Sequence, residues 1–260
     1  MPSLQSVVVL NSWGEFRRKR LDFPHGLERQ KNPKIDIPRQ VQVFNSPHLP
    51  GQGTTGTTLS WHELVDMPQF SVHKLSDWLT SCLNQWPGGL RAERHAEYAQ
   101  LTENLVSILG GGQSIWRQLP QTVHDIFGSR GWAWNGFYVR HGNQLDLAEG
   151  AVGPPVCATL FLQNRGDVGS SGSCWDAILM NQSIALNDVT QWPGYVSCDG
   201  ESRLQTIAGI VCPVRGANHQ PIAVWDLDTE AKLAPEDPVF MSRLLETLSV
   251  ALQPSADDFA

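Results

Sequence analysis

The sequence lacks an apolar run long enough to cross a bilayer and a segment with the pattern of a signal peptide. It also lacks Cys-x-x-Cys and His-Glu-x-x-His pairs, which are common spacings of zinc ligands. Its five cysteines are widely spaced and odd in number, which argues against a secreted disulfide framework. We therefore expect a cytoplasmic protein with reduced thiols, no membrane segment, no metal and no other cofactor.

Positive charge is scarce in most of the chain. Residues 1–50 hold eight Lys and Arg against four Asp and Glu, a net +4, whereas the whole chain carries −7. Residues 51–260 therefore carry −11, which argues against nucleic acid as a ligand of this part. The basic run RRKR at 17–20 is explained more simply as a solvated segment than as a site for an anionic partner.

The first 90 residues differ in pattern from the rest. The stretch NSPHLPGQGTTGTTLS at 45–60 has no periodicity and indicates a loop or linker, while WHELVDM and VHKLSDWLTSCLNQW are candidate short helices. We expect a loop-rich N-terminal extension over 1–90, a main domain over 91–253 and a tail over 254–260.

Helical and strand-like patterns alternate in the main domain. Apolar residues recur at helical spacing over 98–109, and three glycines at 110–112 end that helix. A second helical stretch, QSIWRQLPQTVHDIF, is expected to be interrupted at Pro120. Strand-like runs follow at 132–139, 156–162, 209–214 and 221–228, with a helix at about 175–181 and a closing helix from near Pro238. This order predicts an α+β fold with a mainly antiparallel central sheet flanked by helices.

Three cysteines fall in the strand-rich part of the chain. Cys157 opens an apolar run, and Cys174 follows GSSGS at an expected helix start, where unpaired N–H groups favour a thiolate. Cys198 lies in QWPGYVSCDGES, between two dipeptides that form turns. Each of them, taken alone, is explained better as a small packed residue. Cys82 and Cys212 are assigned to packing.

Two strand-like runs carry further candidates. In WAWNGFY, Trp134, Gly136 and Tyr138 alternate onto one face, and the glycine leaves a slot between two aromatic rings. In AVWDLD, Asp226 and Asp228 share a face, and their mutual repulsion should make one of them bind a proton more readily. A core-facing aromatic pair and a solvated strand end are the alternatives.

Residues 92–252 resemble a GAF domain, and in particular the free methionine-(R)-sulfoxide reductases. The resemblance rests on six segments that occur in the family's order: WNGFYV, GPPVCATL, GSSGSCWDA, LNDVTQWPGYVSCDGES, GIVCPV and AVWDLDT. The 24-residue step from Cys174 to Cys198 fits the family without a gap. All three cysteines that are characteristic of the family have counterparts here.

The resemblance implies a mechanism based on thiols. Cys198 as thiolate attacks the sulfur of free methionine-R-sulfoxide, releases methionine and becomes a sulfenic acid. Cys157 resolves it to a disulfide, with Cys174 as an alternate partner, and thioredoxin reduces that disulfide. Asp226 and Asp228 divide two roles, protonation of the leaving oxygen and binding of the substrate ammonium.

The resemblance also suggests binding residues. Trp134 and Tyr138 match the family's pocket aromatics and would surround the substrate methyl group. Because domains of this kind often pair through their terminal helices, a homodimer is a candidate assembly. Insertions such as QNRGDVG, between Cys157 and Cys174, flank the expected site.

One acid of the family is absent. The family usually carries a glutamate four residues before the proline that aligns with Pro213, and Gly209 stands there in this chain. Counting forward from Cys198 instead gives Gln205, so neither alignment supplies the acid. Glu201 is close enough in sequence to substitute for it.

The departure from the family keeps other functions open. A non-catalytic GAF module that binds a ligand or senses redox state through its thiols is the main alternative to a reductase. A different thiol reaction, such as reduction of another sulfoxide, is a further one. Fold alone cannot choose among these, since GAF domains have many different ligands.

Overall fold

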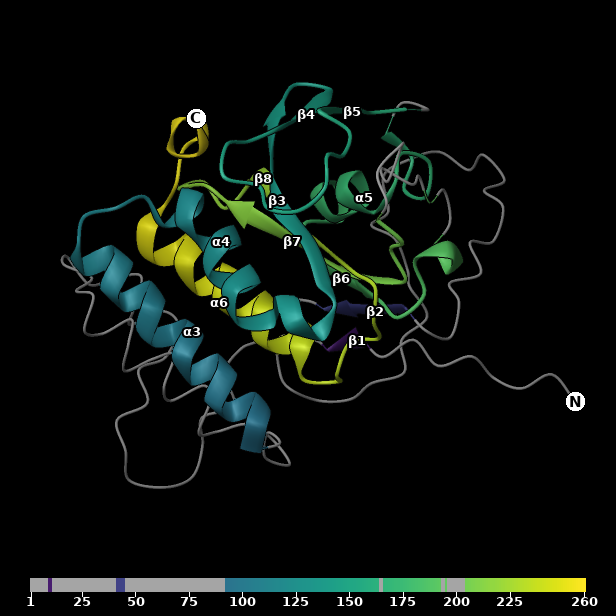
Figure 1. Ribbon diagram of the computed structural model, residues 1–260. Coiled ribbons are helices and arrows are strands. Elements are labelled where there is room, and N and C mark those ends of the chain that lie inside the picture. Colours follow the sequence, from purple (N-terminus) through teal and green to yellow (C-terminus); the bar gives the residue numbers. More distant parts are fainter. Residues whose placement is uncertain (1–8, 11–40, 45–91, 164–165, 193–194, 196–203) are drawn as a thin grey trace, which may run out of the picture.

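The protein contains one central sheet with helices on both faces (Figure 1). The computed structural model describes residues 9–10, 41–44, 92–163, 166–192, 195 and 204–260. Three helices cover one face of the sheet, and a shorter helix lies against the other. The three are α3 (Ala92–Gly110), α4 (Ile115–Phe127) and α6 (Asp237–Leu252), and the shorter one is α5 (Ser173–Met180).

The sheet has eight strands in the order β1-β2-β6-β7-β8-β3-β4-β5. All neighbouring strands are antiparallel except β1 and β2, which are parallel. The strands are β1 (Val9–Leu10), β2 (Val41–Phe44), β3 (Trp132–His141), β4 (Gln144–Leu147), β5 (Thr159–Phe161), β6 (Ser183–Leu186), β7 (Ala208–Arg215) and β8 (Pro221–Thr229). The described residues also form short 3-10 helices, which are η1 (Gly128–Arg130), η3 (Val189–Gln191) and η4 (Ala256–Phe259).

The expected α+β fold with a mainly antiparallel sheet is confirmed. The N-terminal extension adds two strands that the sequence patterns did not indicate: β2 pairs with β6, with Val41 opposite Leu186, and β1 pairs with β2 as the edge strand. The candidate short helices of the extension and Cys82 lie outside the described residues. In the tail, Phe259 of η4 is buried and its ring centroid lies 5.3 Å from that of Trp116. The domain boundaries themselves stay a prediction.

Pro120 lies inside α4, so the expected interruption of this helix is wrong. A proline within a helix removes one backbone hydrogen bond and normally kinks or ends it. Here the apolar face continues across the proline, because Ile115, Leu119 and Val123 are all buried against the main core. The Pro120 carbonyl also accepts a hydrogen bond from the side chain of Asn135, at 3.2 Å. Packing of this apolar face therefore keeps the chain helical on both sides of Pro120.

The two faces of strand β8 pack against two different hydrophobic cores. Trp225 and Leu227 are fully buried on the face covered by α3, α4 and α6. Val224 belongs to the second core, against α5, and Asp226 and Asp228 follow it on that same face by the alternation of a strand. The two acids are thus held on the α5 side of the sheet.

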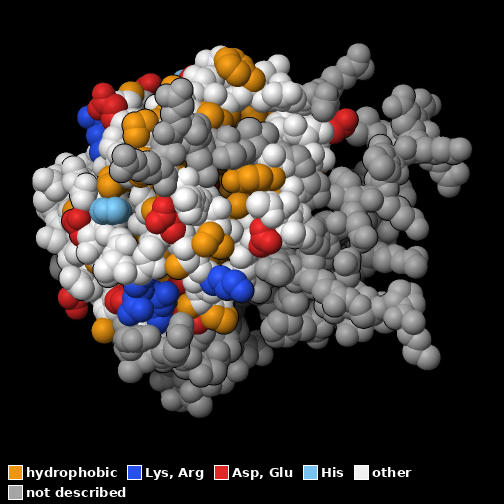
Figure 2. All heavy atoms as spheres, turned by 45° about the vertical axis from the view of Figure 1, so that its right-hand side comes forward, with side chains coloured by type: hydrophobic (Ala, Val, Ile, Leu, Met, Phe, Trp, Pro, Cys, Tyr) orange, Lys and Arg blue, Asp and Glu red, His pale blue; other side chains and the backbone are white. Residues whose placement is uncertain are grey.

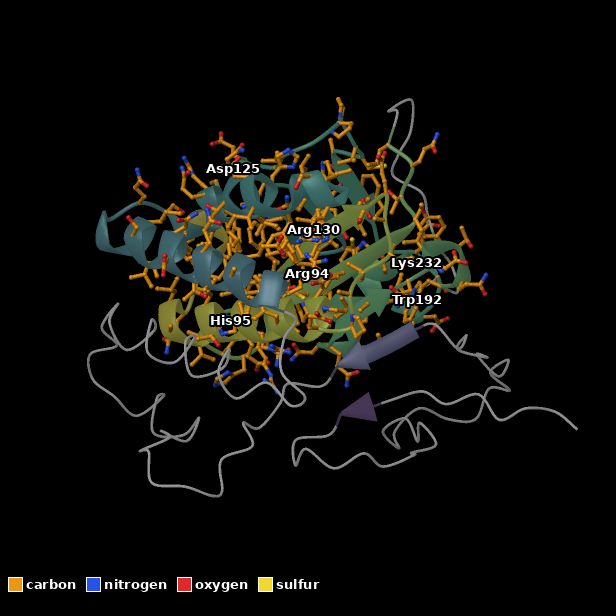
Figure 3. The ribbon with its side chains drawn as sticks, turned by 60° about the horizontal axis from the view of Figure 1, so that its bottom comes forward. Arg94, His95, Asp125, Arg130, Trp192 and Lys232 are labelled. Carbon is orange, nitrogen blue, oxygen red and sulfur yellow. The ribbon has the colours of Figure 1, made fainter. Side chains whose placement is uncertain are left out.

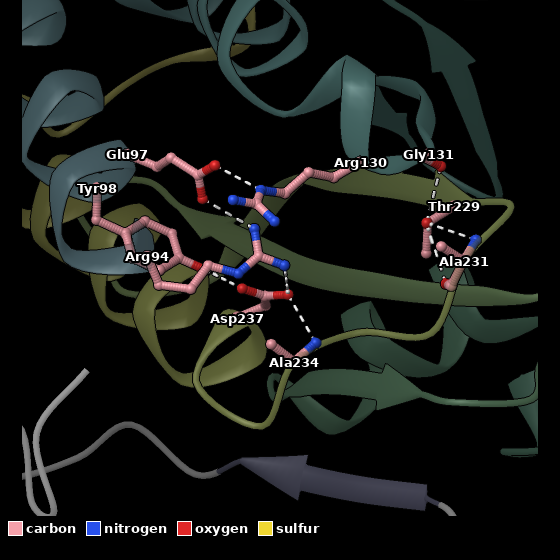
Figure 4. Close-up of polar contacts among 9 residues, drawn as sticks. All are labelled: Arg94, Glu97, Tyr98, Arg130, Gly131, Thr229, Ala231, Ala234 and Asp237. Carbon is pink, nitrogen blue, oxygen red and sulfur yellow. Dashed lines mark hydrogen bonds and ion pairs between the residues drawn. The ribbon is translucent and has the colours of Figure 1, made fainter. Parts of the chain in front are cut away.

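A buried polar network joins the start of α3 to the start of α6 (Figure 4). Asp237, at 0% exposure, accepts hydrogen bonds from the Tyr98 hydroxyl, from Arg94 Nη2 at 3.2 Å and from the Ala234 N–H at 2.8 Å. Burial raises the pKa of Asp237. Arg94 also binds Glu97, which in turn binds Arg130. This network fixes how α3 docks on the rest of the domain.

We expect Asp237→Asn to lower the free energy of unfolding by about 3 kcal/mol, because it removes the charge that faces the buried Arg94 guanidinium. Urea unfolding followed by circular dichroism measures the change. Glu149→Gln is the matched control, since its ion pair with Arg117 is exposed and should contribute about 0–1 kcal/mol. Equal losses in the two variants would contradict a stabilising role of the network.

Candidate functional site

A cavity of about 200 Å³ opens on the α5 side of the sheet. Its wall combines apolar side chains with two carboxylates and two thiols. The lining residues come mainly from β5, α5, β7, β8 and the loops beside them. The lining residues are Cys157, Thr159, Leu160, Phe161, Gln163, Ser171, Gly172, Ser173, Cys174, Leu186, Val189, Tyr195, Gly209, Val211, Asp226 and Asp228. Four of the candidate site residues from the sequence therefore meet at one cavity: Cys157, Cys174, Asp226 and Asp228.

The two acids stand side by side on β8. Asp226 pairs across the sheet with Val211 of β7, and Asp228 pairs with Gly209. All four residues line the cavity, so on this part of the wall the two acidic side chains of β8 lie next to Val211 and Gly209 of β7. A cationic group of a ligand would find two carboxylates here and an apolar surface beside them.

A thiol contacts the first of these acids. Cys174 is the second residue of α5, and its Sγ donates a hydrogen bond of 3.1 Å to Asp226 Oδ2. Burial raises the pKa of Asp226 to about 6, while the hydrogen bonds from Cys174 and from the Leu227 N–H hold it down. Asp226 can therefore exchange a proton near neutral pH, which an ordinary aspartate does poorly.

Cys157 lies on the cavity wall just before β5. The expected strand over 156–162 is shorter in the structure, where it covers Thr159–Phe161. The Tyr138 hydroxyl donates a hydrogen bond of 2.8 Å to the Cys157 carbonyl and holds this segment against β3.

Trp134 and Tyr138 belong to the core on the α5 side of the sheet and are not on the described wall of the cavity, although Trp134 pairs with Asp228 across the sheet. They are 2% and 1% exposed, and neither is among the lining residues within the part of the chain that is described. The slot expected at Gly136 is filled, since a Cβ there would lie 2.7 Å from that of Ala151. The backbone bridge between Asn135 and Val152 brings this segment over the strand.

The structure distinguishes the two positions considered for the missing glutamate. Gly209 lines the cavity opposite Asp228, whereas Gln205 is exposed and does not line it. A Cβ at Gly209 would lie 3.0 Å from the Leu227 carbonyl oxygen and 3.5 Å from Asp228 Oδ1. The cavity therefore has bare backbone where a side chain would press against the Leu227 carbonyl oxygen and contact Asp228. Cys198 and Glu201 lie outside the described residues.

Cys212 lies on the other face of the sheet, within the main core. It is 0% exposed, and burial raises the pKa of its thiol to about 12. A thiol in such surroundings stays protonated and behaves as a small apolar residue. The packing role assigned to Cys212 from the sequence is confirmed.

Sequence patterns missed part of the wall. Ser171 and Gly172 line the cavity from the run GSSGS, and Tyr195 lines it from the stretch that leads to Cys198. Gly172 has φ +88°, a conformation that favours glycine, and it forms the N-cap of α5. The Gly/Ser-rich run directly before Cys174 was the signal for a shaped loop.

Other kinds of site find no support in the described residues. They contain no group of three or more metal-ligating side chains and no helix long and apolar enough to cross a membrane. On the face shown in Figure 2, the described Lys and Arg side chains form small groups, and acidic side chains lie scattered among hydrophobic and uncoloured ones.

No protein-family model matches the chain. The free methionine-R-sulfoxide reductase of Saccharomyces cerevisiae is 25% identical over 115 residues, which are 44% of this chain and 55% of that protein. The chain thus spans about half the length of this curated relative.

Solved structures define the class. A crystal structure of a proposed GAF sensor protein from Burkholderia vietnamiensis has a TM-score of 0.51 and 23% identity, over 65% of this chain and 98% of that one. The free methionine-R-sulfoxide reductase of Neisseria meningitidis, in complex with its substrate, has a TM-score of 0.50 and 21% identity, over 63% and 92%. The protein has a GAF fold. The resemblance to free methionine-R-sulfoxide reductases, expected from the sequence, is confirmed.

We expect Asp226→Asn to raise the melting temperature at pH 8 and to raise it much less at pH 4.5. An acid whose pKa is raised from 3.8 to about 6 by folding favours the folded state below pH 4, and this contribution is lost as the pH rises through 6. Removing the charge therefore relieves a cost that exists only at the higher pH. Thermal unfolding at the two pH values measures it.

Asp146→Asn is the control for this titration. The pKa of Asp146 is lowered by hydrogen bonds from Thr159 and Gln144, so the loss of its charge should reduce stability at pH 8. If Asp226→Asn is less stable than the wild-type protein at pH 8, the charge of Asp226 does not destabilise the folded protein as proposed.

Proposed function

We propose that the protein reduces free methionine-R-sulfoxide to methionine. The observation that carries the proposal is the meeting of Cys157, Cys174, Asp226 and Asp228 at one small cavity. These residues lie far apart in the sequence, and packing alone has no need for two thiols beside two acids. The similarity to the reductase of Saccharomyces cerevisiae supports the same activity.

The cavity suits a small zwitterion with an apolar end. In the proposed reaction, the substrate ammonium lies against the carboxylate of Asp228, and its methylsulfinyl end faces Asp226 and apolar wall residues such as Val211. The Cys198 thiolate attacks the sulfoxide sulfur, the oxygen passes to Cys198 as a sulfenic acid, and methionine leaves. Asp226 supplies the proton for that oxygen, since its raised pKa lets it carry one near neutral pH.

Two thiols compete for the resolving step, and their settings favour Cys157. In this step a thiol attacks the Cys198 sulfenic acid, water leaves, and a disulfide forms. Cys157 is half-buried on a segment before β5, whereas Cys174 is 6% exposed, lies in a helix and is bonded to Asp226. A loop residue can approach another sulfur more easily than a helical one. Thioredoxin then reduces the disulfide by exchange.

A second function is favoured by one observation, the glycine at position 209. The cavity has no third acid there, and a GAF module that binds a small ligand or senses redox state through its thiols would need none. Such a module would bind methionine or its sulfoxide without turnover. Location in the cytoplasm and assembly as a homodimer belong to both functions as expectations.

The decisive test is an assay in which thioredoxin and its reductase couple turnover to NADPH oxidation. We expect consumption of free methionine-R-sulfoxide, with no turnover of the S epimer or of a peptide-bound sulfoxide. Cys198→Ser should lose all activity, because it lacks the attacking sulfur. Asp226→Asn should lose about 10²–10⁴-fold in kcat without a lower melting temperature at pH 8, if Asp226 is the proton donor.

No turnover of the wild-type protein above the Cys198→Ser background would reject the reductase. Calorimetric binding of methionine by that inactive protein would then support the GAF binding module.

The resolving step gives a separate prediction. After one equivalent of methionine-R-sulfoxide without reductant, Cys157→Ser should accumulate a sulfenic acid that dimedone labels, because its resolving thiol is gone. Cys174→Ser should form the disulfide as the wild-type protein does. Mass spectrometry of the labelled peptides measures both. Dimedone labelling of Cys174→Ser alone would reverse the assignment.

A further inference from the structure

A second buried carboxylate lies beside the cavity, and the proposed mechanism does not use it. Asp176 is 0% exposed in α5, two residues after Cys174. Its Oδ1 accepts a hydrogen bond of 2.9 Å from the Gly169 N–H, and its Oδ2 accepts one of 2.6 Å from Trp192 Nε1. Both partners are neutral N–H groups, and within the described residues no charged group contacts this acid.

The two contacts require a carboxylate. Both partners are donors, so each needs its own acceptor oxygen, and an asparagine would offer one oxygen and one N–H group. Burial raises the pKa of Asp176 to about 6, and the two hydrogen bonds hold it down. A buried charge without a cation is costly. Its place here therefore indicates that the two contacts matter.

Asp176 joins separate parts of the cavity wall. Gly169 belongs to the segment that continues to Ser171 and Gly172, both of which line the cavity. Trp192 follows η3, whose Val189 lines the cavity.

The second contact reaches further along the wall. The Trp192 carbonyl accepts a hydrogen bond of 3.1 Å from the N–H of Tyr195, another lining residue. Asp176 itself sits in the helix that places Cys174 against Asp226. One side chain thus connects α5 with the wall segment that precedes this helix and with the wall segment that follows η3.

We propose that Asp176 is a positioning residue, whose carboxylate fixes α5 and the two wall segments in the arrangement that the reaction needs. This inference rests on the reductase function proposed above. Trp192 is also six residues before Cys198 in the sequence, so the indole contact holds the described end of the chain that carries the attacking thiol. The acids of β8 do not depend on this contact, since the sheet ladder holds them.

The kinetic test compares two single variants and their combination. Asp176→Asn and Trp192→Phe should each lower kcat by about 10- to 100-fold, since small displacements of reacting groups cost that much, while KM changes less than about threefold. The double variant should be no slower than Asp176→Asn, because both changes break one contact. Dithiothreitol replaces thioredoxin as reductant, so that reductant docking does not enter.

Asp237→Asn is the matched control for destabilisation. Its carboxylate is equally buried, but it belongs to the network of Arg94 and Arg130, and Figure 3 shows those residues well apart from Trp192. Assayed below its melting temperature, it should keep kcat within about twofold of the wild-type value. Equal kinetic losses in Asp237→Asn and Asp176→Asn, or multiplicative losses in the double variant, would overturn the inference.

A spectroscopic readout separates this inference from the proposed function. In protein labelled with ¹⁵N in tryptophan, Trp192→Phe identifies the Trp192 indole signal, and Asp176→Asn should move that signal upfield. If the wild-type protein turns over nothing, the reductase proposal fails while this shift still supports the contact. An unchanged indole signal in Asp176→Asn overturns the positioning role, whether or not the protein is a reductase. If Asp176→Asn does not fold, the kinetics of Trp192→Phe alone decide.

Discussion

The site depends on the packing of strand β8 between two different cores. Trp225 and Leu227 are fully buried against the three helices, and together they fix which face of the strand points where. A slip of one residue would place Asp226 and Asp228 in that core, where burial makes their charges costly. The apolar side of the strand thus holds the acidic side in place. The catalytic potential of the cavity is a consequence of how the opposite face is packed.

The same arrangement explains why the cavity can hold a proton-exchanging acid. Asp226 is buried by its position on the sheet, and burial raises its pKa to about 6. The Cys174 thiol donates a hydrogen bond of 3.1 Å to this carboxylate, which keeps the pKa from rising further. Burial also raises the pKa of Asp176, two residues further along α5, to about 6. The helix therefore carries, within one turn, a thiol for the site and a carboxylate for its walls.

The sequence predicted those parts that regular periodicity determines. Alternation in AVWDLD placed Asp226 and Asp228 on one face, and the Gly/Ser run before Cys174 indicated a helix start; the structure has both. The prediction was wrong where distant segments decide. Ala151 fills the slot at Gly136 from a loop that no local pattern connects to β3.

Long-range pairing explains the other differences between prediction and structure. Val41 of the extension pairs with Leu186 across about 145 residues of chain, a contact that local composition does not encode. Pro120 stays within α4 because its helix is held by buried neighbours rather than by backbone bonds alone. The contacts of Asp176 span only 7 and 16 residues, but they too depend on how the chain folds back, and the run CWDA does not indicate that its carboxylate will meet Gly169 and Trp192.

The proposed reaction is tested most directly by a crystal structure of the Cys198→Ser protein soaked with methionine-R-sulfoxide. We expect the ligand in the cavity, with its ammonium bound to Asp228 and its sulfur facing the hydroxyl of residue 198. We also expect Cys157 near enough to residue 198 for a disulfide, with Cα atoms within about 7 Å. A ligand bound elsewhere, or residue 198 directed away from an empty cavity, would contradict it.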